Sequence, residues 1–400
     1  MDLRLSQRVH RIKPSPTLTV TARAAALKAA GHDIIGLGAG EPDFDTPDHI
    51  KEAAKRALDR GFTKYTPVDG IPSLKQAIIR KLSRDNGLDY APEQIVVSCG
   101  GKQCFYNLAQ ALLDPGDEVV IPAPYWVSYP DMVLLADGVP VIVDGPVEQG
   151  FKVTPAQVAA AIGPRTRMVV INSPSNPTGV CYTRAELAAL GEVLRAHPRV
   201  LVATDDMYEH IIWGEEPFAN ILMACPDLYP RTVVLNGVSK SYSMTGWRIG
   251  YAAGPALLIR AMVNIQSQST SNPTSIAQVA AEAALDGDQG FIREMVRAFK
   301  ARHDYMVAAL NRLKGVHCLP AQGAFYLFPD VRKAQAAAGM QDDVAFSNWL
   351  LREAGVAVVP GSAFGAPGFV RLSIATSMQN LEQAIARLER TLGSSDTDRP

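Results

Sequence analysis

The most informative part of the sequence is the stretch GVSKSYSMTGWRIG, residues 237–250. It follows an apolar, β-branched run at residues 233–236 that we interpret as a buried strand. A lysine just after a central strand, here Lys240, lies where α/β sheets place their ligands. Small neighbouring residues leave room for a planar ligand, and Arg248 supplies a cation suited to phosphate or carboxylate. The alternative is that Lys240 is a surface lysine in a turn and Arg248 a structural arginine. That interpretation explains poorly the hydroxyl residues and glycines of the stretch.

Strands and helices alternate on the N-terminal side of this stretch. Amphipathic helical patterns occupy residues 103–113 and 184–196. Further buried strands are predicted at residues 95–98, 118–121, 139–143, 168–172 and 200–204. This alternation predicts an α/β fold with a mainly parallel sheet.

From about residue 290 the pattern changes to helices and short strands without regular alternation, which indicates a smaller α+β domain. We expect helices at 291–313, 344–354 and 378–392, and strands at 316–319, 324–328, 356–359 and 369–374. Near the N-terminus, residues 33–37 form a short apolar run, and Thr46 is expected to be the N-cap of a helix that begins at Pro47. The polar stretch 393–400 is expected to be disordered.

The composition is that of a globular protein. Of 400 residues, 47% are hydrophobic and 20% charged, which excludes bulk disorder. Lys plus Arg number 39 against 40 acidic residues, so the chain lacks the excess of basic residues that is typical of nucleic-acid-binding proteins. The five cysteines are scattered and contain no C-x-x-C pair, which argues against a disulfide framework or a zinc knuckle. With no signal-peptide pattern and no apolar run of about 18 residues, we expect a cytoplasmic protein without membrane partners or bound metal.

Three other predicted strands or turns carry polar groups that suit a ligand. The glycines of residues 98–102 could let an anion approach a helix N-terminus, although a plain tight turn is the commoner role of such a Gly-Gly pair. Asp205 ends a strand and could hold a protonated heterocycle nitrogen; alternatively, Asp205 or Asp206 caps the next segment. Asn176 lies in a proline-rich turn that would fix its amide. The motif GLGAG at residues 36–40 lacks a following apolar helix, so we interpret it as a substrate-facing loop and not as a dinucleotide-binding motif.

Taken together, these motifs resemble the class I pyridoxal-phosphate aminotransferases, in their order and spacing and over nearly the whole chain. The chain looks most like the bacterial aspartate/prephenate aminotransferase branch. The matching motifs are Gly40-Glu41-Pro42-Asp43-Phe44, Lys64-Tyr65, Gly100-Gly101-Lys102, Pro124-Tyr125-Trp126, residues 172–179, 205–208 and 240–248, and Val370-Arg371-Leu372.

The resemblance implies pyridoxal 5'-phosphate as cofactor and assigns a role to each matching residue. Lys240 would form the Schiff base with the cofactor and move the substrate proton. Asp205 would keep the pyridine nitrogen protonated, and Tyr208 and Asn176 would hydrogen-bond the ring oxygen. Trp126 would stack on the ring and contact substrate.

The phosphate and substrate contacts follow from the same resemblance. Gly101, Lys102 and Arg248 would surround the phosphate, and Tyr65 would reach the phosphate of the neighbouring subunit, which implies a homodimer. Arg371 would bind the substrate α-carboxylate beside the Gly40 backbone and Asn176.

The sequence departs from the animal and enteric aspartate enzymes, in which a partner-subunit arginine binds the distal carboxylate. The corresponding region, residues 263–285, contains no arginine or lysine. In the branch that this chain resembles, two lysines are thought to take that role, and they match Lys13 and Lys102. Ser15 and Thr17 could add hydrogen bonds. A dicarboxylic substrate is therefore favoured, although Lys13 could equally be a solvated arm residue, and a substrate role for Lys102 would weaken its phosphate role.

The function expected from the resemblance is ping-pong transfer between aspartate and 2-oxoglutarate. Prephenate or aromatic aminotransferase activity is the alternative, followed by a pyridoxal-phosphate lyase on the same fold. The chain has neither the spare length nor the basic patch of a transcriptional regulator with an aminotransferase-like domain, and a nicotinamide dehydrogenase is favoured less than that regulator. The implied fold is the three-layer α/β fold type I, with residues 1–45 as N-terminal arm and part of the small domain, 46–290 as cofactor-binding large domain and 291–400 as small domain.

Overall fold

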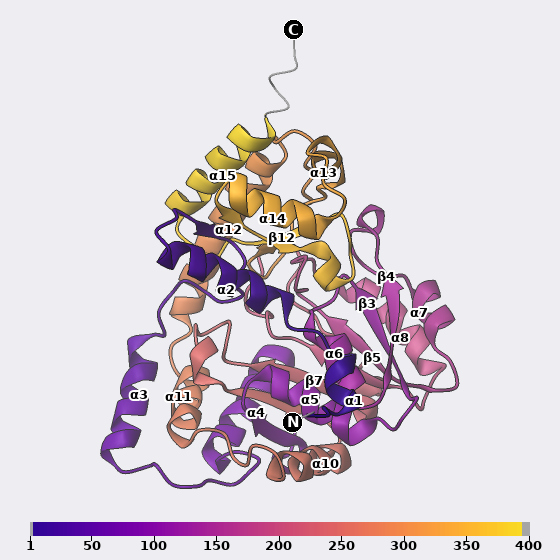
Figure 1. Ribbon diagram of the computed structural model, residues 1–400. Helices are drawn as coiled ribbons and strands as arrows, with labels where there is room; N and C mark the ends of the chain where they lie inside the picture. Colours follow the sequence, from indigo (N-terminus) through magenta and orange to yellow (C-terminus); the bar gives the residue numbers. More distant parts are fainter. Residues whose placement is uncertain (1–2, 394–400) are drawn as a thin grey trace.

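The computed structural model describes residues 3–393 of the chain (Figure 1). Within these residues no helix combines the length and apolar character needed to cross a membrane. The predicted disorder of residues 393–400 falls outside the described part, except for Gly393, which ends the last helix.

A mixed sheet forms the centre of the larger part of the molecule. Within residues 3–393 it has seven strands in the order β2-β8-β7-β6-β5-β3-β4. β8 runs antiparallel to both of its neighbours, and the other pairs are parallel. The mainly parallel sheet is confirmed. The strands are β2 (Ile95–Ser98), β3 (Glu118–Ala123), β4 (Val139–Asp144), β5 (Thr166–Asn172), β6 (Leu201–Asp205), β7 (Thr232–Gly237) and β8 (Gly250–Ala253).

Helices cover both faces of this sheet, which makes three layers. Alternate residues of a strand face opposite sides: Val97 belongs to a core with α4, α8 and α11, whereas Val96 belongs to a second core with α5, α6 and α10. The predicted three-layer α/β architecture is therefore confirmed. The helices are α3 (Asp48–Asp59), α4 (Pro72–Asn86), α5 (Gly101–Leu112), α6 (Ser128–Leu135), α7 (Pro155–Ala161), α8 (Arg184–Arg195), α9 (Ile221–Ala224), α10 (Ala256–Ser267) and α11 (Ser275–Asp286).

The C-terminal part builds a separate core with two small sheets. Its long helix α12 (Gly290–Leu310) packs with α15 (Met378–Leu392), and both lie in the upper half of Figure 1 with α13 (Arg332–Ala337) and α14 (Asp343–Glu353). The antiparallel sheet has the order β11 (Val359–Pro360), β12 (Val370–Ser373), β9 (Tyr326–Leu327).

The N-terminal segment joins this C-terminal part. It contains α1 (Gln7–Arg11), α2 (Pro16–Ala29) and β1 (Ile35–Gly36), which pairs in parallel with β10 (Val356–Ala357). α2 contacts β1, β10 and β11, and Figure 1 shows it in indigo beside the C-terminal helices. The assignment of residues 1–45 to the small domain, and the boundaries at 46 and 291, stay predictions.

Two local predictions are wrong. The run 316–319 is not a strand: His317 forms an isolated bridge with Asp330. Thr46 does not cap α3, which begins at Asp48 after Pro47. The Thr46 hydroxyl instead donates to the Ser243 carbonyl (2.6 Å) and accepts from Trp247 Nε1 (3.0 Å).

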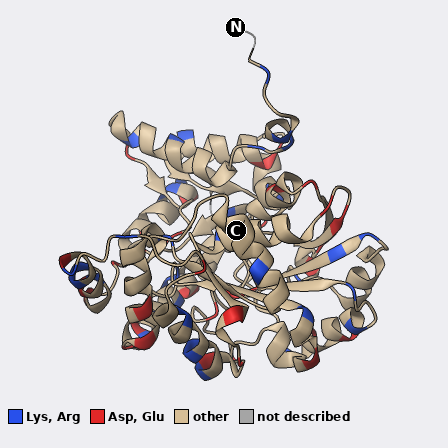
Figure 2. Ribbon diagram, turned by 90° about the horizontal axis from the view of Figure 1, so that it is seen from below, with Lys and Arg blue, Asp and Glu red and all other residues tan. Residues whose placement is uncertain are grey.

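Charged side chains of both signs are interspersed over the helices. In Figure 2, positions of Lys or Arg and of Asp or Glu are scattered over the molecule in the view shown. This mixture agrees with the formal net charge of −1.

Candidate functional site

A cleft at the carboxyl ends of the parallel strands collects most of the predicted site residues. β5, β6 and β7 end here, and the C-terminal part contributes the opposite wall. Open α/β sheets bind ligands at this edge. The lining includes Gly40, Gly101, Lys102, Trp126, Asn176, Asp205, Tyr208, Lys240, Arg248 and Arg371, together with Ser15 and Thr17.

Lys240 lies in the turn after β7. Its Nζ donates a hydrogen bond to the carbonyl of Gly40, from the N-terminal loop. Burial, with the positive charges of Arg371 and Arg248 nearby, lowers the pKa of Lys240 to about 8. A larger fraction of this amine is therefore neutral near neutral pH than for an ordinary lysine, which is the form that reacts with a carbonyl group.

Asp205 is the last residue of β6 and presents its carboxylate to the cleft. One oxygen accepts from the hydroxyl of Tyr129 and the other accepts from the N–H of Met207 (3.2 Å). Burial raises the pKa of Asp205 above its ordinary value. A cation placed against this carboxylate would offset the cost of burying its charge.

Arg371 and Asn176 form the wall next to Tyr208. Arg371, on β12, is 2% exposed and donates to Asn176 Oδ1 (2.9 Å) and to the Gly38 carbonyl (2.8 Å). Its guanidinium lies 4.4 Å from the ring centre of Tyr326, whose hydroxyl is 2.8 Å from that of Tyr208. Since Arg371 occupies Oδ1 of Asn176, the amide N–H₂ of Asn176 is left as the donor.

The Nε nitrogen of Arg371 is a hydrogen-bond donor that still needs an acceptor. Within the described chain, Nε of Arg371 is buried and has no hydrogen-bond partner. A buried guanidinium nitrogen normally has an acceptor, so a carboxylate ligand would complete the arrangement.

The N-terminus of α5 and Arg248 form a cradle of backbone and positive charge. Arg248 is anchored to the carbonyls of Thr245 (2.8 Å) and Cys99 (3.3 Å). A Cβ on Gly100, whose φ is +88°, would lie 2.3 Å from a guanidinium nitrogen of Arg248; a Cβ on Gly101 would lie 2.5 Å from Met207 Cε. The first turn of a helix has backbone N–H groups without intrahelical acceptors, which attract phosphate.

The outer wall of the cleft combines an aromatic ring with polar groups. Trp126 is half-buried and packs edge-on against Tyr129, with ring centres 5.1 Å apart. Lys102 Nζ lies 5.3 Å from the centre of the Trp126 ring. From the N-terminal segment, Thr17 contributes a buried hydroxyl that has no hydrogen-bond partner among the described residues.

Two predicted residues do not line this cleft. Lys13 is exposed on the N-terminal segment, outside the lining. Tyr65 is 92% exposed and lies with Phe62 on a separate surface depression beside α3 and α11.

Sequence reasoning missed two tyrosines of the site. Tyr129 holds Asp205, and Tyr326 joins Tyr208 to Arg371. The sequence did carry a signal for Tyr326, since it lies in the predicted strand 324–328. Tyr129 lies in the first turn of α6, and Trp126 precedes that helix by two residues, so helical spacing would not have paired them.

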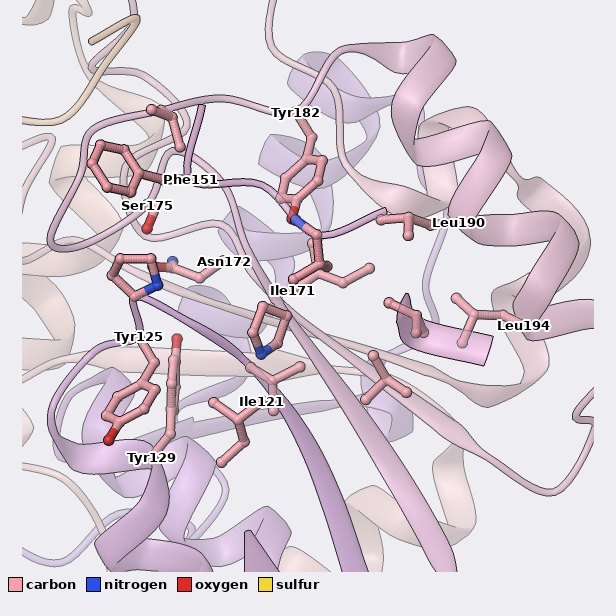
Figure 3. Close-up of a pocket in the computed structure, with 17 residues that line it drawn as sticks. Ile121, Tyr125, Tyr129, Phe151, Ile171, Asn172, Ser175, Tyr182, Leu190 and Leu194 are labelled. Atoms are coloured by element: carbon pink, nitrogen blue, oxygen red, sulfur yellow. The ribbon is translucent and has the colours of Figure 1, made fainter. Parts of the chain in front are cut away.

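A second cavity shares Asn172 with the cleft and is lined mostly by apolar side chains. Figure 3 shows Ile121 from β3 and Leu190 and Leu194 from α8 around it, with the rings of Tyr125 and Tyr182 at its edge. Among residues 3–393, its lining includes no lysine, arginine, histidine or carboxylate. We assign the chemistry to the cleft that contains Lys240.

Comparison with known proteins identifies the family of the chain. Residues 32–388 match the family model described as aminotransferase class I and II. The chain is 61% identical over 396 residues to an aspartate/prephenate aminotransferase of Nitrosomonas europaea, covering 98% of this chain and 100% of that protein. It is 55% identical to an aspartate aminotransferase of Geobacillus stearothermophilus, covering 97% of this chain and 98% of that protein.

Solved structures show the same relationship. The aspartate aminotransferase from Rhizobium meliloti matches with a TM-score of 0.93 and 46% identity, covering 98% of this chain and 100% of that chain. The Thermus thermophilus aspartate aminotransferase with maleate matches with a TM-score of 0.92 and 45% identity, over the same shares of the two chains. These matches confirm the predicted fold type. The chain belongs to the class I and II aminotransferase family, and it is an enzyme of amino-group transfer.

Proposed function

We propose that the protein is a pyridoxal 5'-phosphate-dependent aspartate aminotransferase, with Lys240 as the residue that links to the cofactor. The observation that carries the proposal is the convergence, in one cleft, of a lysine with lowered pKa, a buried carboxylate, a buried arginine and a glycine-arginine cradle. Each of these groups is chemically complementary to one part of an amino-acid substrate or of this cofactor.

The residues present fit the cofactor. The cradle of Gly100, Gly101 and Arg248 suits the phosphate, because it combines the N-terminal N–H groups of α5 with a guanidinium, and a Cβ at Gly100 would displace that guanidinium. Asp205 would hold the protonated ring nitrogen, and Tyr208 and Asn176 would donate hydrogen bonds to the ring oxygen. Trp126 would stack on the ring.

The cofactor, when bound, supplies an electron sink and a carbonyl carbon that accepts the amino group from one substrate and returns it to the next. Lys240 would move the proton at the substrate Cα, which requires its neutral amine. Arg371 would bind the α-carboxylate and so fix the orientation of Cα toward Lys240.

A dicarboxylic substrate follows from the polar outer wall. Lys102 and the unpartnered hydroxyl of Thr17 line the cleft, and Lys13 lies on the same N-terminal segment as Thr17. We propose that these groups bind the distal carboxylate. The Thermus neighbour was solved with maleate, a four-carbon dicarboxylate, which supports the same substrate class here.

We propose further that the protein is a cytoplasmic homodimer with shared active sites. Tyr65 supports this assembly, because a tyrosine that is 92% exposed beside Phe62 offers a surface for a second copy. In the dimer, Tyr65 of the partner subunit would reach the phosphate.

The absorption spectrum of the purified protein with pyridoxal 5'-phosphate tests the cofactor assignment. We expect a visible band that L-aspartate and L-glutamate remove faster than L-phenylalanine. Lys240→Ala should abolish both the band and turnover, whereas Lys55→Ala, a change at an exposed lysine of α3, should alter neither. Full turnover by the Lys240→Ala protein would refute the proposal, and ammonia release without consumption of a 2-oxo acid would indicate a lyase.

The distal-carboxylate assignment has its own test. Lys13→Met and Lys102→Met should each lower kcat/KM for aspartate by about tenfold or more, because each removes a charged hydrogen bond. The value for phenylalanine should change little. An equal loss of kcat/KM for both substrates would show that the lysines do not bind the distal carboxylate.

A further inference from the structure

A buried ion pair lies beside the turn that carries Lys240, outside the cleft lining. Lys81 is 1% and Glu209 4% exposed, and Lys81 Nζ donates to Oε1 of Glu209. The same oxygen accepts from Asn236 Nδ2 (2.7 Å), and Oε2 accepts from Asn86 Nδ2 (2.8 Å). Lys81 also donates to Asn86 Oδ1 (2.8 Å). Both oxygens of the carboxylate are therefore satisfied by directional hydrogen bonds.

These partners come from three separate segments of the chain. Lys81 and Asn86 belong to the last turns of α4. Glu209 follows Tyr208 directly, and Asn236 is the next-to-last residue of β7, four positions before Lys240. The carboxylate thus joins one helix to the backbone segments that present Tyr208 and Lys240 to the cleft.

A second link runs parallel to the first. The ring of His210 contacts Asp85 of α4 through Nε2 (3.0 Å) and the hydroxyl of Ser241 through Nδ1 (3.3 Å). Ser241 follows Lys240 directly. Asn236 and Ser241 lie on either side of Lys240 in the chain, so both ends of its turn are tied to α4.

Stability alone is a weak reason for such a pair. Removing two charges from water is costly, and apolar side chains of similar size often replace a buried ion pair without loss of stability. What an apolar pair cannot supply is the set of hydrogen bonds that fixes Glu209 against Asn236 and Asn86.

We propose that Glu209 is a positioning residue for the transfer reaction, holding Tyr208 and the Lys240 turn in register through its hydrogen bonds to Asn236, Asn86 and Lys81. This inference rests on the proposed function, since it concerns the cofactor lysine. Small displacements of a reacting group are enough to slow a reaction strongly.

Two variants test the inference in the cofactor-loaded protein. Glu209→Gln removes the charge and turns an N–H₂ group toward neighbouring donors. The double variant Lys81→Met with Glu209→Leu removes both charges and the hydrogen bonds, and is designed to stay folded. For both we expect kcat with aspartate to fall by about tenfold or more with little change in KM. The visible circular dichroism of the bound cofactor should also weaken, because it reports the fixed geometry around the ring.

A stability-matched control separates positioning from folding. Leu228 is 1% exposed and precedes β7 at the end opposite Asn236. Leu228→Ala should lower Tm but leave kcat and the circular dichroism of the cofactor unchanged. Wild-type kcat and dichroism in either folded Glu209 variant would overturn the inference. Failure of the wild type itself to show the cofactor band would instead overturn the proposed function.

Discussion

At the scale of single residues, two adjacent carboxyl groups have opposite surroundings. Asp205 faces the cleft, whereas Asp206 is 1% exposed and accepts hydrogen bonds from Thr204 Oγ1 and Asn220 Nδ2, both at 2.7 Å. Neither donor is charged. Burial and the nearby charge of Glu209 raise the pKa of Asp206 to about 7.

This raised pKa predicts a pH dependence of stability. Since the folded-state pKa lies above the unfolded value of about 4, the stabilisation due to Asp206 is complete below that value. It is lost as the pH rises through about 7. The amide that Asp206→Asn introduces does not titrate, so the Tm of this variant relative to wild type should rise by roughly a few degrees between pH 5 and pH 8.

Thermal unfolding at several pH values measures this effect. The exposed Asp59→Asn, on α3, provides the control and should show a pH-independent difference from wild type. A pH-independent difference for Asp206→Asn as well would contradict the prediction.

The residue types alone could not distinguish the role of Asp205 from that of Asp206. The sequence left open whether Asp205 is a ligand or a cap, and the structure shows the cap contact to the N–H of Met207 together with the contact to Tyr129. The environment of Asp206 depends on Asn220, which is distant in the sequence. Local patterns carry no information about such a partner.

At the scale of elements, the start of α5 depends on the glycine before it. Gly100 has a φ of +88°, and the space for its Cβ is taken by Arg248. A side chain here costs backbone strain and also displaces the arginine of the cradle.

Gly100→Ala should therefore weaken binding of pyridoxal 5'-phosphate by about tenfold or more, the cost of disturbing one charged hydrogen bond. Gly116, in the turn after α5, has a φ of +89° with nothing within 4 Å of its Cβ position. Gly116→Ala carries the strain without the crowding, so it should lower Tm but leave cofactor affinity unchanged. Equal affinity losses in a fluorescence titration of both variants would show that strain alone is responsible.

The strands were predictable to different extents, for physical reasons. Residues 95–98 match β2 in full because the strand is buried on both faces and reads as a continuous apolar run. β8 was not predicted, since its sequence GYAA offers little pattern. The run 316–319 resembled a strand but has no partner strand beyond the bridge at His317. Pairing between distant segments, which decides such cases, is not visible in a local pattern.

At the scale of the whole molecule, the proposed dimer makes each active site depend on two chains. In a heterodimer of Lys240→Ala and Tyr65→Ala subunits, one site combines both changes and the other contains neither. If Tyr65 serves the partner's site, mixing two impaired proteins should restore one native site per heterodimer.

Activity of the separately tagged and purified heterodimer measures this complementation. The two parent homodimers, treated in the same way, are the controls. If a confirmed heterodimer recovers no activity, Tyr65 contributes to the active site of its own subunit and not to that of the partner. A monomer in light scattering would refute the shared site directly.

The pairing of β1 with β10 has a consequence for the synthesis of the protein. Ile35 meets Val356, so the second strand of that sheet leaves the ribosome only when nearly the whole chain has been translated. The strands of the large sheet are complete by Ala253 and can associate earlier. The nascent protein therefore carries its first strand unpaired through most of translation, and the wall that contributes Arg371 is the last to be assembled.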